Sequence, residues 1–155
     1  MTAIGEGAFA KCGSLEVINI PASVKEFGNG IFESCSNLKE VTLQSGVSSI
    51  APRMFGSCEK LQKVNIPGSV KTISSDAFIC CMGLTNITLP DGMLSIGTGA
   101  FLGCQNLQTV SIPESMTMIN NDAFMYCKSL LSVNIPKQCM LGKNAFPAEC
   151  KVIRR

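Results

Sequence analysis

The chain has 155 residues, a net charge of +2, nine cysteines and no histidine or tryptophan. Its hydrophobic content of 46% is that of a globular protein and excludes a disordered chain. The small net charge argues against binding to nucleic acid, and no apolar run approaches the roughly 18 residues that span a bilayer, so membrane insertion is not expected.

One repeat accounts for nearly the whole sequence. Phenylalanine recurs every 23 residues, and cysteine and leucine follow it three and six positions later. The phenylalanines are Phe9, Phe32, Phe55, Phe78, Phe101 and Phe124, and the cysteines are Cys12, Cys35, Cys58, Cys81, Cys104, Cys127 and Cys150. This period predicts a single solenoid domain over residues 1–155, with about six and a half repeats. Because Met1 leads directly into repeat sequence and no signal peptide is visible, we expect a fragment of a longer chain.

Each repeat predicts the same elements in the same order. In the first, AFAKC (8–12) has a spacing that suits one or two helical turns, and LEVINI (15–20) alternates as a strand that Pro21 ends. The strands LKEVTL (38–43) and LQKVNI (61–66) follow in register and should stack in parallel about 4.8 Å apart. Only the last copy slips, since Leu141 is one residue early and an extra residue separates Phe146 from Cys150.

The motifs LxxVxIP and AFxxCxxL at this period resemble the leucine-rich repeats of the BspA-like, or Treponema pallidum, type over about residues 4–153. The resemblance implies an α/β leucine-rich-repeat solenoid. It would have a curved parallel sheet on the concave side and short helical turns on the convex side. It also implies a protein that lies at the cell surface or is secreted and binds host or partner proteins.

The cysteine column could supply disulfides, metal ligands, a nucleophile or small core side chains. Stacked side chains point the same way, no histidine is present, and no lysine recurs beside the column, so core packing is predicted. Seven unpaired thiols would fit a reducing compartment or an anaerobic habitat. No metal site, cofactor or catalytic residue is expected.

The first candidate binding surface is the outward face of the predicted concave sheet. Its residues are small or polar, and the pair Glu40 and Lys63 should lie side by side. A binding face and a merely solvated sheet are equally compatible with this composition. The residues are Asn19, Glu40, Thr42, Lys63, Asn65, Asn86, Thr88, Thr109, Ser111 and Asn134.

The second candidate surface is an apolar ridge formed by Ile79, Leu102, Met125 and Tyr126 on the turns. An exposed patch of this kind marks an interface, although the side chains could equally tuck inward. The first coil should leave Phe9 partly uncovered at an open end. Together, the open coil and the apolar ridge predict a weak, concentration-dependent homodimer.

The resemblance implies a protein-binding or adhesion module, and the lack of catalytic candidates leads us to expect that it is not an enzyme. The alternative is a structural spacer that displays other domains and has no ligand of its own.

Overall fold

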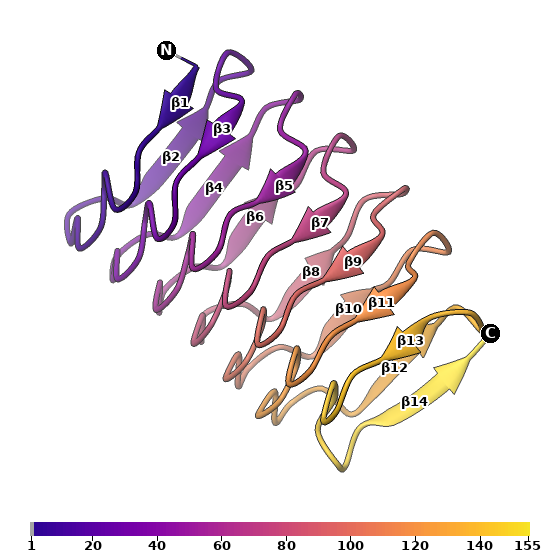
Figure 1. The fold of residues 1–155 in the computed structure, drawn as a ribbon. Coiled ribbons are helices and arrows are strands. Elements are labelled where there is room, and N and C mark those ends of the chain that lie inside the picture. Colours follow the sequence, from indigo (N-terminus) through magenta and orange to yellow (C-terminus); the bar gives the residue numbers. More distant parts are fainter. Residues whose placement is uncertain (1) are drawn as a thin grey trace.

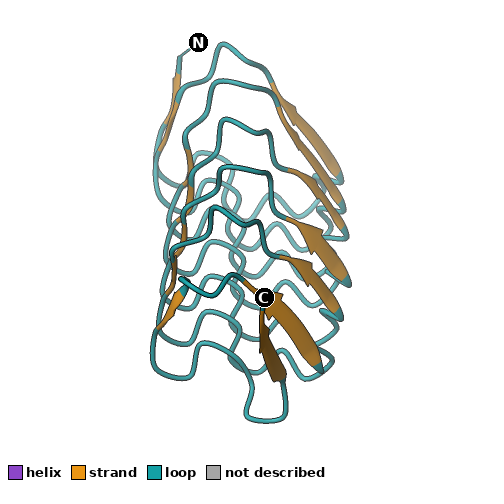
Figure 2. Cartoon of the chain, turned by 90° about the vertical axis from the view of Figure 1, so that its right-hand side faces the viewer, coloured by secondary structure: helices purple, strands orange, loops and turns teal. Residues whose placement is uncertain are grey.

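The computed structural model describes residues 2–155; Met1 lies outside the described residues. The chain winds as a solenoid of stacked coils, with its two ends at opposite ends of the stack (Figure 1). Each complete coil contributes one strand to a main row, a shorter strand to a second row, and a set of turns between them (Figures 1 and 2).

The main row forms where the sequence alternates between apolar and polar residues. Its strands run parallel and hydrogen-bond in the groups β2-β4-β6, β8-β10 and β12-β14. Their bounds are β2 (Val17–Ile20), β4 (Glu40–Leu43), β6 (Lys63–Asn65), β8 (Asn86–Thr88), β10 (Thr109–Ser111), β12 (Ser132–Ile135) and β14 (Lys151–Arg154). The strands begin later than predicted because the leucine of each repeat still belongs to a turn, as in the bond from Leu38 N–H to the Cys35 carbonyl.

A second row of short parallel strands was not predicted as a sheet. Its groups are β1-β3 and β5-β7-β9-β11-β13. The bounds are β1 (Ala3–Ile4), β3 (Glu26–Phe27), β5 (Ser49–Ile50), β7 (Thr72–Ile73), β9 (Ser95–Ile96), β11 (Met118–Ile119) and β13 (Met140–Leu141). Two residues are too few to show alternation, so periodicity could not reveal this row.

The predicted helical turns were wrong, and with them the α/β class: residues 2–155 contain no helix, and the solenoid is built from strands and turns (Figure 2). The residues two before and two after the repeat phenylalanine adopt left-handed backbone angles. Around Phe124 these are Asp122 at φ 56° and Tyr126 at φ 62°. Such residues reverse the path of a right-handed helix, so only single turns form.

These turns stack through backbone hydrogen bonds between successive coils, which we call the turn ladder. Phe101 N–H donates to the Ala123 carbonyl at 2.7 Å, and Gly103 N–H donates to the Met125 carbonyl at 2.9 Å. The same two bonds join the earlier coils, for example from Phe32 to Met54 and from Ser34 to Gly56. The ladder satisfies backbone groups that a helix would satisfy internally.

The core consists of the predicted repeat positions. Phenylalanine rings stack from Phe9 to Phe146, with neighbouring centroids 5.0–5.7 Å apart. The predicted core placement of Cys104 is confirmed, since it is fully buried. Its thiol does more than fill space, because Sγ donates to the Phe78 carbonyl at 3.1 Å, and four other cysteines make the equivalent bond. That carbonyl also accepts the Cys81 N–H, so the thiol column links each coil to the preceding one.

The two ends of the stack differ. At the first coil Phe9 is 39% exposed and Leu15 and Ile18 are half-buried, as predicted for an open end. At the last coil, Arg154 donates to the carbonyls of Lys137 and Cys139, both at 2.8 Å. The irregular C-terminal repeat therefore closes part of its end with side chains.

Candidate functional site

The main strand face, meaning the outward side of the main row, presents the first predicted set of residues. Because side chains alternate along a strand, Val41 and Val64 point into the core while Glu40, Thr42 and Lys63 point outward. Of the ten predicted residues, eight are exposed and Glu40 and Thr42 are half-buried. The parallel register aligns them in columns from coil to coil.

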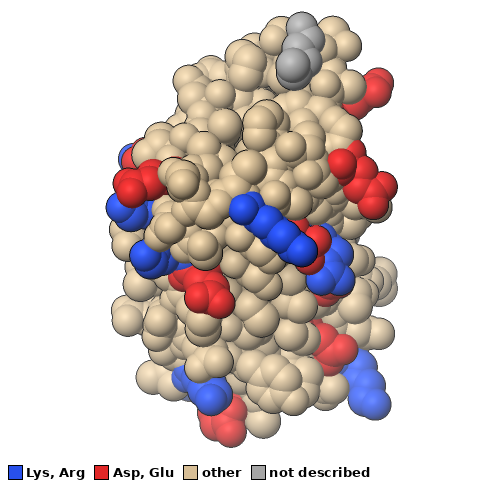
Figure 3. Space-filling model, turned by 90° about the vertical axis from the view of Figure 1, so that its left-hand side faces the viewer, with Lys and Arg blue, Asp and Glu red and all other residues tan. Residues whose placement is uncertain are grey.

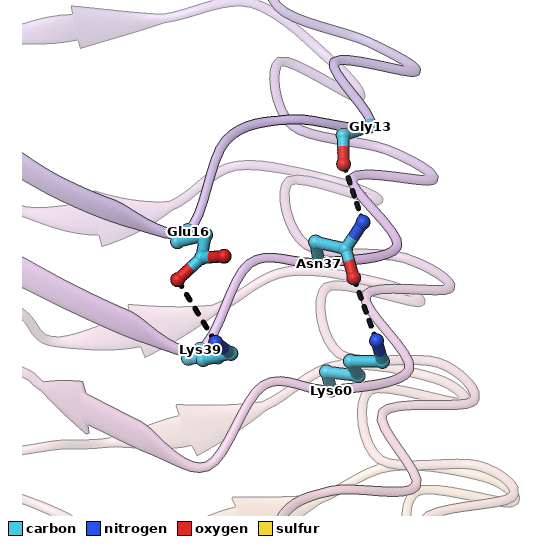
Figure 4. A network of polar contacts seen from close by, with 5 residues as sticks. All are labelled: Gly13, Glu16, Asn37, Lys39 and Lys60. Carbon is cyan, nitrogen blue, oxygen red and sulfur yellow. Dashed lines mark hydrogen bonds and ion pairs between the residues drawn. The ribbon is translucent and has the colours of Figure 1, made fainter.

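The N-terminal half of this face carries paired charges. The predicted contact between Glu40 and Lys63 is confirmed, with the carboxylate and ammonium 2.8 Å apart. Lys39 donates to Glu16 at 2.8 Å, and this bond and its charge lower the pKa of the Glu16 carboxyl (Figure 4). Such exposed pairs contribute little stability, but they leave few charges free for a ligand.

A second polar chain runs beside these pairs at the edge of the turns. Lys60 donates to the side-chain oxygen of Asn37 at 2.7 Å, and the amide of Asn37 donates to the Gly13 carbonyl at 2.6 Å (Figure 4). Asn106 makes the same type of bond to the Met82 carbonyl at 2.8 Å. These bonds give the polar side chains a structural role in joining successive coils.

The C-terminal half of the main strand face is uncharged over β8 and β10 and in the outward residues of β12. Its residues are amides and hydroxyls, which can both donate and accept hydrogen bonds. They are Asn86, Thr88, Thr109, Ser111, Ser132 and Asn134, all exposed. On the adjoining strand β14, the same face presents Lys151 beside Ser132 and the 39% exposed Ile153 beside Asn134.

The apolar ridge is only partly exposed. Ile79, Leu102 and Met125 are half-buried, while Tyr126 is 55% exposed. Ile79 packs over the preceding coil, because a Cβ on Gly56 would lie 3.2 Å from its Cγ2 atom. The ridge thus combines inward packing with one exposed aromatic ring at its C-terminal end.

Other exposed apolar side chains stand outside the predicted sites. Leu94, beside the second row, is 45% exposed, and Met140, in the second row, is 60% exposed; no sequence pattern indicated either of them. Leu131 is 67% exposed where the other repeats have Glu16, Lys39, Gln62, Thr85 and Gln108. This replacement of a polar residue by leucine is visible in the sequence and could have marked Leu131 as a candidate contact residue.

Among residues 2–155, no three His, Cys, Asp or Glu side chains come together to hold a metal ion. In that same range no helix could cross a membrane. Acidic and basic side chains are interspersed on the face in Figure 3, with no continuous patch of one sign there.

The repeat and the fold are shared with known leucine-rich repeat proteins. The model of the BspA type leucine-rich repeat region matches residues 1–83 and 37–153. The chain belongs to this family. No curated protein sequence matches it.

Solved structures of leucine-rich repeat proteins share this architecture. A Bacteroides ovatus leucine-rich repeat protein is 30% identical with a TM-score of 0.80, over 99% of this chain and 43% of that one. The Treponema pallidum leucine-rich repeat protein is 26% identical with a TM-score of 0.77, and the match covers 98% of this chain and 77% of that one. A leucine-rich cell surface protein of Faecalibacterium prausnitzii is 23% identical with a TM-score of 0.50, and the match covers 99% of this chain and 64% of that one. This BspA-type chain thus spans less than half of the Bacteroides protein.

Proposed function

We propose that this BspA-type chain is a non-enzymatic protein-binding module that acts at the cell surface, and that the main strand face carries its contacts. The observation that supports the proposal is the array of exposed amides and hydroxyls that β8 and β10 hold in register and that the neighbouring strand β12 continues. A rigid array of donors and acceptors can match the polar groups of a folded partner without rearranging. The name of the Faecalibacterium relative supports the surface location.

The alternative is a spacer with no ligand of its own. It is favoured by the N-terminal half of the face, where Glu16, Lys39, Glu40 and Lys63 already pair with one another. The face also lacks the aromatic anchors that dominate most interfaces.

The test is binding of the purified chain to a panel of immobilised extracellular-matrix proteins. The variant Thr88→Lys adds a long charged side chain to the centre of the uncharged half. Leu94→Lys is the matched control, because Leu94 is exposed beside the second row and Lys71 occupies the equivalent place. Binding that Thr88→Lys abolishes and Leu94→Lys preserves would support the proposal. No binding to any panel member, or equal loss in both variants, would favour the spacer.

A further inference from the structure

The turn ladder breaks at the last coil. In the preceding coils the residue two positions after the repeat phenylalanine donates its N–H to the next coil, as Cys80 does to Leu102 and Gly103 does to Met125. The equivalent donor is Tyr126, and its acceptor would be the carbonyl of Pro147. That bond is absent, and Tyr126 N–H makes no hydrogen bond to residues 2–155. The extra residue between Phe146 and Cys150 accounts for the break, because it alters the last set of turns.

A hollow of about 600 Å³ opens at this break. Its volume lies in the range of ligand sites, and most of its lining is apolar. The apolar lining comes from Met125, Tyr126, Leu130, Leu131, Phe146 and Pro147. It therefore continues the apolar ridge, of which Met125 and Tyr126 are members.

A second, more polar hollow of about 470 Å³ adjoins the first. The two share Lys128 and Leu131, and the second extends to Gln108 and Ser132 at the start of the main strand face. Because they share these two residues, we treat the two hollows as one site, apolar at the turns and polar at the strands, and call it the end groove.

At two positions of the end groove, the stacking of the coils does not explain which residue type is present. Tyr126 places an aromatic side chain at φ 62°, a backbone region that is unfavourable for bulky residues. The other coils have Lys11, Ser34, Ser57, Cys80 or Gly103 at this position. Leu131 likewise replaces a polar residue and is 67% exposed. Exposed aromatic and apolar side chains beside a hollow are typical of an interface.

We propose that the end groove binds an extended, apolar peptide segment of a partner protein. A peptide carbonyl accepts the free N–H of Tyr126, in the place that the Pro147 carbonyl would take in a regular coil. An apolar side chain fills the hollow against Phe146 and Leu131, and the peptide continues across Lys128 toward Ser132. The inference goes beyond the proposed function, because its anchor lies on the turns and either site can exist without the other.

The charges of the groove favour a peptide over an anionic amphiphile. Lys128 and Glu149 both line the first hollow, and neither forms an ion pair within residues 2–155. An anionic head group is attracted by Lys128 and repelled by Glu149, so it gains little net attraction. A peptide is neutral along its backbone and offers N–H donors to the carboxylate of Glu149.

The chain supplies its own probe for a test. Tyr126 is the single tyrosine and tryptophan is absent, so tyrosine fluorescence reports on the groove alone. The peptide acetyl-Leu-Phe-Leu-amide is titrated into the full chain, with acetyl-Ser-Asn-Ser-amide and decanoate in parallel. We expect a saturable change for the apolar peptide only, and slower hydrogen exchange at the Tyr126 amide when it is bound.

Two matched variants complete the experiment. Leu131→Gln installs the residue that Gln108 provides one coil earlier, so folding is preserved while the apolar contact is lost, and binding weakens at least about tenfold. Leu94→Gln makes the same change beside the second row and leaves binding unchanged. Equal effects of the two variants, no saturable change, or binding of the polar peptide would overturn the proposal. Binding of decanoate without the apolar peptide would instead make the groove an amphiphile site.

Discussion

The phenylalanine stack predicts that replacing a phenylalanine by alanine lowers the free energy of unfolding by different amounts along the chain. Phe101 is fully buried and lies between Phe78 and Phe124, with both ring centroids 5.0 Å away. Phe101→Ala removes the buried ring and both stacked contacts, so the free energy of unfolding should fall by about 3–5 kcal/mol.

Phe9 provides the internal comparison. It is 39% exposed and stacks on Phe32 alone, with centroids 5.5 Å apart. Phe9→Ala should therefore lower the free energy of unfolding by less than about 2 kcal/mol. Thr88→Ala, on the main strand face, should cost less than about 1 kcal/mol.

The measurement is urea unfolding followed by circular dichroism, with a free energy extrapolated for each variant. The slope of the unfolding free energy against urea concentration must be the same in all variants. A changed slope would mean that the repeat protein no longer unfolds cooperatively, and the free energies could not be compared. Equal losses for Phe101→Ala and Phe9→Ala would show that stacking from both sides does not set the cost. A loss at Thr88 as large as at Phe101 would mean that the buried and exposed faces are assigned wrongly.

Three further predictions concern the thiols and the ends. Denatured without reductant, the chain should titrate at least seven free thiols, and finding three or more disulfides would contradict the core column. Burial raises the pKa of Cys58 to about 12 from 9.0, and the unfolded state therefore releases its proton first. The contribution of the Cys58 thiol to stability should be constant below about pH 9 and be lost as the pH rises toward 12. Cys58→Ala should make the fall in stability over that range shallower, and an unchanged slope would refute this assignment. Sedimentation over a wide concentration range should show a weak dimer, and a strict monomer would remove both the open first coil and the apolar ridge as self-association surfaces.

The core and the main row could be predicted because the same residues recur at the same spacing. Phe78, Cys81 and Leu84 occupy positions that every complete coil fills alike, and a 23-residue period leaves no other stacking register. The contact between Glu40 and Lys63 followed directly from that register.

The turns could not be predicted in the same way. A cysteine three residues after a phenylalanine fits a helix as well as a pair of turns, and the left-handed positions hold residues as different as Arg53, Asp76 and Gly99. Their backbone angles are set by hydrogen bonds to the next coil, which local propensity does not describe. The end groove escaped prediction for a related reason, because it forms only where the last coil departs from the period.

In a stack of near-identical coils, most positions are fixed by the need to match the coil above and the coil below. Serine or lysine at the position of Tyr126, and glutamine at that of Leu131, satisfy this need in other coils of the same chain. The apolar residues at these two positions are therefore not required for stacking. Both line the same hollow, and the backbone N–H of Tyr126 is left without an acceptor by the stack. The irregular last coil thus has two consequences: Arg154 closes part of the end, and the altered turns leave a hollow lined by apolar side chains at the proposed peptide site.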